Sequence, residues 1–177
     1  APDYTTPQRL RRFGVRTQDL SLAIAMHVDT STGEGSMWAA AMATAFCGLL
    51  RGCELGLQDG ETFDPTRHLT RADCTFRKSH DGTLYMVLII RPAKKGPGQQ
   101  KTVPLLIAAG GTLLDPVRLM QRYFALHPVS AAEAATTPLF CKGGRAISVR
   151  EIRGMVQELM RRLGLDPRRF GAHSLRI

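Results

Sequence analysis

Residues 37–50 form the most apolar stretch of the chain, MWAAAMATAFCGLL, without a single charged side chain. Ser36 precedes the stretch and Arg51 follows it. A serine can cap a helix N-terminus, and a cation suits the negative end of the helix dipole. A helix that is apolar on every side must be surrounded by other elements. The sequence therefore predicts a central helix here, too short to span a bilayer.

Two more helices are predicted from their start signals. Residues 17–27 carry capping side chains at Thr17 and Asp19, followed by apolar positions for one buried face. Asp115 comes directly before Pro116, which places an N-cap ahead of the residue most favoured at the first helical position.

A last helix is predicted to begin at Ser148, which forms a capping box with Glu151. Apolar residues then recur at spacings of three and four up to Leu163, and Gly164 ends the helix. The opposite side of this helix carries basic residues that could bind DNA or could equally form a solvated surface: Arg150, Arg153 and Arg161.

Three short strands are predicted in the middle of the chain. Residues 73–76 and 84–90 are separated by an Asp-Gly turn, and residues 101–105 form a third strand that Pro104 would end. Strands joined by such short turns pair antiparallel. The expected fold class is α+β, mainly α-helical with a small three-stranded antiparallel sheet.

Charge points to a polyanionic partner. The chain has 24 Lys+Arg against 15 Asp+Glu, a net charge of +9 with a pI near 10.0. Residues 142–177 hold nine of the basic and three of the acidic residues, so +6 of the excess lies in one fifth of the chain. Nucleic acid is the commonest partner of such a surface.

The four cysteines show no C-x-x-C spacing and are interpreted as reduced thiols, not as a zinc site. No stretch is long and apolar enough for a membrane span, and no targeting sequence is visible. We therefore expect an intracellular protein without a metal or other cofactor. It would lie in the cytoplasm of a prokaryote or the nucleus of a eukaryote.

Two motifs could carry chemistry. His173 and Arg176 stand three apart, so on a helical turn both side chains project from one face, suited to gripping a phosphate. Arg51 ends the apolar helix, and Glu54 lies three residues on, within reach to orient it in a buried pair. Each motif has a plainer interpretation: a solvated helix start for the first and a structural ion pair for the second.

Taken in order, the motifs carry a family resemblance. An apolar helix ends in G-L-L-R-x-x-E-L, a three-stranded sheet has a Lys-bearing hairpin that closes on T-V-P-L, and H-x-L-R comes last. In that order the chain resembles the catalytic domain of the tyrosine recombinases (phage integrase-like). The resemblance covers residues 17–177, which leaves residues 1–16 as a basic arm or linker.

The resemblance implies roles for the upstream residues. Arg51 matches the family's first catalytic arginine, and Glu54 matches the acidic residue that supports it. Lys94 matches the catalytic hairpin lysine, with Lys95 as the alternative because the loop is slightly longer than usual. The partner implied is double-stranded DNA, on which full-length family members act as homo-tetramers.

His173 and Arg176 match the family's H-x-x-R box. In the family, a tyrosine hydroxyl attacks a DNA phosphodiester and forms a 3′-phosphotyrosyl link, which conserves the bond energy for rejoining. Two arginines neutralise the charge that builds on the phosphoryl oxygens, a lysine protonates the departing 5′-oxygen, and a histidine assists proton transfer. The resemblance thus implies site-specific recombination or integration of DNA without a metal.

The chain departs from the family at the nucleophile, which follows H-x-x-R in other members. Its tyrosines, Tyr4, Tyr85 and Tyr123, all lie upstream. We therefore expect a C-terminally incomplete catalytic domain that cannot cleave DNA alone. Two alternatives remain: a non-catalytic DNA-binding module derived from a mobile-element recombinase, and a type IB topoisomerase, which uses related residues.

Overall fold

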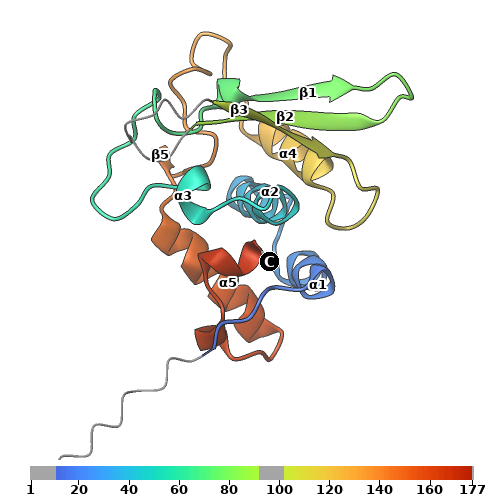
Figure 1. Ribbon diagram of the computed structural model, residues 1–177, viewed down its shortest axis with the longest axis vertical. Helices are drawn as coiled ribbons and strands as arrows, with labels where there is room; N and C mark the ends of the chain where they lie inside the picture. Colours follow the sequence, from blue (N-terminus) through green and yellow to red (C-terminus); the bar gives the residue numbers. More distant parts are fainter. Residues whose placement is uncertain (1–10, 92–101, 177) are drawn as a thin grey trace, which may run out of the picture.

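The computed structural model describes residues 11–91 and 102–176 and places a helical body beneath a small sheet (Figure 1). Its main elements, in chain order, are α1 (Thr17–His27), α2 (Gly33–Cys47), α3 (Gly52–Leu55), β1 (Cys74–Lys78), β2 (Leu84–Ile90), β3 (Val103–Ala108), α4 (Pro116–Leu126), β4 (Cys141–Lys142), β5 (Arg145–Ala146) and α5 (Val149–Arg162). Short 3₁₀ turns are η1 (Arg71–Asp73), η2 (Pro167–Arg169) and η3 (Ala172–Leu175). The predicted α+β class, with its three-stranded antiparallel sheet, is confirmed.

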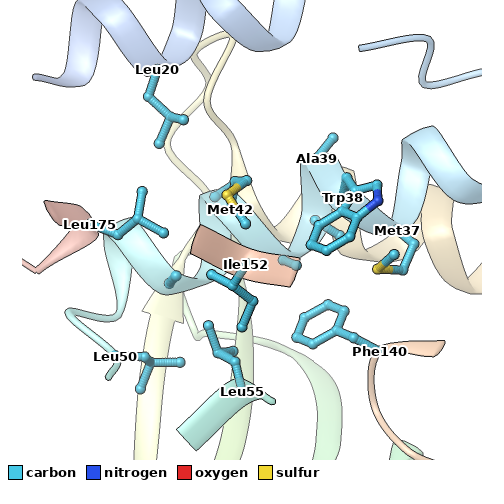
Figure 2. Packing of buried hydrophobic residues seen from close by; sticks show 14 of the residues in the cluster. Leu20, Met37, Trp38, Ala39, Met42, Leu50, Leu55, Phe140, Ile152 and Leu175 are labelled. Atoms are coloured by element: carbon cyan, nitrogen blue, oxygen red, sulfur yellow. The ribbon is translucent and has the colours of Figure 1, made fainter. Parts of the chain in front are cut away.

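Helix α2 is the central element, as predicted: every residue from 36 to 45 is buried. Its start differs from the prediction. The helix begins at Gly33 because Thr32, not Ser36, is the N-cap, and the Thr32 hydroxyl accepts a hydrogen bond from the Gly35 amide at 3.1 Å. Ser36 lies inside the first turn, where its hydroxyl donates to the Gly33 carbonyl. Figure 2 shows the side chains of α2 among those of the surrounding elements.

The chain leaves α2 through a strained turn. Gly48 packs so tightly that a Cβ there would lie 2.8 Å from the Thr44 carbonyl oxygen and 3.0 Å from the Ile107 side chain in β3. Leu49 then takes a left-handed conformation, with φ of 51°, and is more than half exposed. The turn directs Leu50 back into the core and releases Arg51 at the surface.

This turn gives a first prediction. A left-handed conformation costs a side-chain-bearing residue about 1 kcal/mol, and glycine removes that cost. Replacing Leu49 with glycine should therefore raise the free energy of unfolding in urea by up to about 1 kcal/mol. Leu49→Ala keeps the Cβ and is the matched control. Equal stability of the two variants would contradict the assignment of strain to this residue.

The sheet has the order β1-β2-β3, with β2 in the middle. Its inner face, formed by Met86, Leu88 and Ile107, is buried against the helices. The third strand differs from the prediction because Pro104 lies within β3, opposite Ile89, and does not end it. An edge strand tolerates a proline, since one of its sides has no strand to receive an N–H donor.

Helices α4 and α5 begin where predicted. The Asp115 carboxylate accepts hydrogen bonds from the Val117 and Arg118 amides at 3.0 and 3.1 Å. The capping box of α5 is complete, because Glu151 accepts from the Ser148 amide and Ser148 accepts from the Glu151 amide. The apolar face of α5 is buried on the core: Ile152, Val156, Leu159 and Met160.

The Glu151 cap should make stability depend on pH. Hydrogen bonds from Arg145 and then Ser148 lower the pKa of Glu151 from 4.5 to about 2. A carboxylate whose pKa falls on folding stabilises the fold fully above its unfolded value and loses that contribution as the pH drops toward the folded one. Wild type should therefore exceed Glu151→Gln in unfolding free energy by about 1 kcal/mol at pH 7. That difference should shrink between pH 4.5 and about 2; a constant difference would contradict the assignment.

All four cysteines are free, and burial raises the pKa of Cys74 to about 12. Within the two described stretches, no helix has the length and apolar character needed to cross a membrane. The same residues contain no group of three or more His, Cys, Asp or Glu side chains able to hold a metal ion.

Candidate phosphate-binding site

Arg51 is the N-cap residue of α3, and its side chain is exposed. Glu54 accepts a hydrogen bond from the Arg51 backbone amide at 2.6 Å. The expectation of a buried pair, with Glu54 orienting the guanidinium, is therefore wrong: the carboxylate holds the backbone. This hydrogen bond fixes the position of the Arg51 backbone. The guanidinium does not take part in it and is available to an anion.

His173 and Arg176 lie on and directly after η3, and both are exposed. Ala172, Ser174 and Leu175 are buried between and around them. A helical turn is thus present at H-x-x-R as η3, and both basic side chains are exposed on it. The Gly171 amide donates to the Ser174 hydroxyl at 3.0 Å, which ties the start of the turn to its middle.

Arg51 and the H-x-x-R turn, 122 residues apart in sequence at His173, come together at Gly52. A Cβ on Gly52 would lie 3.1 Å from the Ala172 Cβ and 3.2 Å from a Val149 methyl. We call the contact of Gly52, Val149 and Ala172 the three-way junction. Each junction residue has a basic residue with an exposed side chain as its chain neighbour: Arg51, Arg150 and His173. The fold therefore brings together the backbone segments that carry these three residues.

The basic residues predicted on the outer side of α5 are of two kinds, those without an ion pair and those with one. Arg150 and Arg153 are exposed, and neither forms an ion pair with any described residue. Arg161 instead pairs with Glu158 at 2.8 Å, and Arg162 pairs with the same carboxylate at 2.8 Å. The i,i+3 and i,i+4 spacing to Glu158 was the sequence signal for this pairing.

Most other cations of the basic C-terminal segment are also paired. The pairs are Lys142 with Glu34, Arg145 with Glu151, and Arg168 and Arg169 with Asp166. Of the segment's described arginines and lysine, those left without a carboxylate are Arg150, Arg153 and Arg176. Within this segment, the positive charge available to a ligand thus comes from Arg150, Arg153 and Arg176.

The two candidate hairpin lysines, Lys94 and Lys95, lie outside the described residues. The strand that leads to them ends at Ile90, and the next residue, Arg91, is bound to Asp73 at 2.7 Å and to the His68 carbonyl at 3.2 Å. It also donates to the Pro65 carbonyl. Arg91 therefore anchors the base of the hairpin, a role that nothing in its local sequence indicated.

Tyr123 lies on the core face of α4, as predicted, and is fully buried. Its hydroxyl accepts a hydrogen bond from the Cys141 amide at 3.1 Å, and the Arg71 guanidinium lies 4.3 Å from its ring centroid. Burial raises the pKa of Tyr123. Tyr85 lies in the middle strand of the sheet, and Tyr4 lies outside the described residues. Tyr123 is a core residue and is not available to attack a phosphate.

Neither a family model nor a curated protein matches the sequence. Solved structures do match the fold. XerH site-specific recombinase bound to difH substrate, in a pre-cleavage complex, has a TM-score of 0.60 and 18% identity over 98% of this chain and 43% of the recombinase chain. Its post-cleavage complex with palindromic difH substrate has a TM-score of 0.57 and 18% identity over 92% and 39%.

The chain therefore spans about two fifths of the recombinase chains whose fold it shares. At 18% identity the likeness shows the fold and not the activity. The predicted architecture, a catalytic domain like that of the tyrosine recombinases, is confirmed at this level.

Proposed function

We propose that this chain is the phosphate-gripping part of a tyrosine recombinase that breaks and rejoins double-stranded DNA. The observation that supports this most is the three-way junction, which brings the Arg51 turn against the H-x-x-R turn. The fold is shared with a recombinase whose structures hold its DNA substrate before and after cleavage. The cations nearest the junction have no carboxylate partner among the described residues, as an anion site requires.

In the proposed mechanism, the guanidinium groups of Arg51 and Arg176 bind the two non-bridging oxygens of one DNA phosphate. Their planar forks match this geometry, and their charge offsets the negative charge that grows as a nucleophile attacks phosphorus. His173 takes part in proton transfer at the same phosphate. Lys94, or Lys95 in its place, would donate the proton that the departing 5′-oxygen needs.

The nucleophile would be a tyrosine hydroxyl that loses its proton and forms the bond to phosphorus as the bond to the 5′-oxygen breaks. The resulting 3′-phosphotyrosyl link would be resolved when a 5′-hydroxyl attacks it in turn, which restores the diester. Full-length relatives in this family would act as tetramers on two duplexes, and we propose the same assembly for a longer form of this chain.

A second candidate function is a DNA-binding module without catalysis. The observation that favours it is the state of the described tyrosines, since Tyr123 is buried with its hydroxyl bonded and Tyr85 lies within the sheet. Both candidates require DNA binding through phosphates. They differ in whether a tyrosine can reach the bound phosphate.

We expect the 177-residue chain to form no covalent adduct with a nicked suicide DNA substrate, because Tyr123 is buried with its hydroxyl bonded and Tyr85 lies in the middle strand of the sheet. The measurement is a denaturing gel of labelled DNA after incubation with the protein. A covalent band that disappears in Tyr4→Phe or Tyr85→Phe would contradict this expectation and identify the nucleophile. Binding of the same DNA without an adduct is the expected result.

A further inference from the structure

The segment before α1 is bound to the H-x-x-R region, although part of it was expected to be an arm. The Phe13 amide donates to the Arg169 carbonyl, and the Val15 amide donates to the Ser174 carbonyl, both at 2.8 Å. Val15 is buried. We call residues 12–15 the N-terminal strap. It reaches the middle of the H-x-x-R motif itself, because Ser174 follows His173 directly.

Aromatic contacts hold the strap in place. The Phe13 ring meets Phe170 edge to face, with centroids 6.4 Å apart. The Arg169 guanidinium lies over the Phe13 ring, 4.9 Å from its centroid. Edge-to-face aromatic contacts and cation–π contacts each contribute on the order of 1 kcal/mol. With the two backbone hydrogen bonds, they fix the position of the neighbouring Arg12.

Arg12 lies against the start of the H-x-x-R turn. Its Nη1 atom is 3.1 Å from the point where a Cβ on Gly171 would stand. The Gly171 φ of −166° is extended, so any residue could adopt this backbone, and the missing side chain serves to leave room for the guanidinium. Arg12 is exposed and forms no ion pair within the described stretches.

Arg16, which follows the strap directly, differs from Arg12 because it has a carboxylate partner. Arg16 is bound to the Asp19 carboxylate through two hydrogen bonds of 2.8 and 3.0 Å. Arg12, like Arg176, has no carboxylate partner among the described residues. A guanidinium without such a partner is available to a polyanion.

We propose that Arg12 is an additional DNA-phosphate contact, held by the N-terminal strap beside the H-x-x-R turn. This inference rests on the proposed function. The guanidinium would bind a phosphate of the same backbone that Arg51 and Arg176 engage, with the fork geometry suited to phosphate oxygens. The strap thereby makes the segment before the domain part of the phosphate site.

The test compares Arg12→Gln with Arg11→Gln, its exposed neighbour, and with Arg16→Gln, the carboxylate-paired control. Affinity for a duplex oligonucleotide is measured by fluorescence anisotropy across a salt series. We expect Arg12→Gln to weaken binding about tenfold and to reduce the slope of log K against log salt by about 0.9, as for one lost phosphate contact. The two controls should each change affinity by less than about threefold.

A second variant, which does not change the net charge, tests whether the position of the Arg12 guanidinium matters. Gly171→Ala would place a methyl group 3.1 Å from the position of the Arg12 Nη1 atom, so the guanidinium would have to shift by a few tenths of an ångström. It should weaken binding in the wild type and have no further effect in Arg12→Gln. Additive effects, or equal losses in Arg11→Gln and Arg12→Gln, would overturn the inference. A wild type that does not bind duplex DNA would instead defeat the proposed function.

Discussion

Replacing Arg176 with glutamine is expected to lower the affinity for duplex DNA by about 10- to 100-fold, and Arg51→Gln should do the same. Each change removes a charged hydrogen-bond donor pair from the proposed phosphate, and such bonds are worth about 1.5–3 kcal/mol each. Both side chains are exposed, and neither pairs with a described carboxylate, so the fold should not change. The measurement is equilibrium binding at fixed salt, with circular dichroism as the check on folding.

The matched control is Arg161→Gln. Arg161 is also exposed and basic, but it already pairs with Glu158, which keeps Arg162 as a second partner when Arg161 is lost. Its substitution should change DNA affinity by less than about threefold. Equal losses in Arg161→Gln and Arg176→Gln would mean that the protein binds DNA through net charge alone.

Leu175→Ala is expected to lower the free energy of unfolding strongly and also to weaken DNA binding. Leu175 is 1% exposed and lies in the sequence between His173 and Arg176, the two basic residues of the H-x-x-R turn. It belongs to the same core cluster as Leu50, the residue before Arg51 (Figure 2). Truncating a buried leucine costs about 2–5 kcal/mol in unfolding free energy. It should also loosen both turns and weaken DNA binding.

Leu139→Ala separates these two consequences, because Leu139 is equally buried but binds the Leu69 carbonyl through its backbone, away from η3. It should lose a similar unfolding free energy in urea and keep its DNA affinity at a temperature where both variants are folded. If both variants lose affinity equally, Leu175 acts only through global stability.

Elements with complete local signals could be predicted from the sequence. The Asp115-Pro116 start and the Ser148–Glu151 capping box specify α4 and α5 through contacts between residues at most three apart. The start of α2 could not be predicted in the same way. Its N-cap is Thr32, whereas the apolar pattern begins only after Ser36. A Cβ on Gly33 would collide with the His127 ring, a contact between residues far apart in sequence that no local pattern indicates.

In the candidate site too, the residues could be predicted from local motifs, but the contacts between them could not. Arg51, His173 and Arg176 stand in motifs that can be read along the chain, and their residue types indicated a phosphate. The contacts that assemble them are non-local: Gly52 against Ala172, and Val15 against Ser174. No local pattern shows that Glu54 binds the Arg51 amide and not its guanidinium, since both atoms lie within reach of a residue three positions on.

The central claim is that Arg51 and Arg176 hold one DNA phosphate between them. It is tested most directly by the salt dependence of DNA binding. The proteins compared are the wild type, both single variants and the double variant Arg51→Gln/Arg176→Gln. The wild type should lose affinity steeply between about 50 and 200 mM salt. Each single variant should lower the slope of log K against log salt, and the double variant should lower it by about 1 in total, as for one shared phosphate. A wild-type affinity that does not change with salt, or a double variant with the wild-type slope, would contradict the claim.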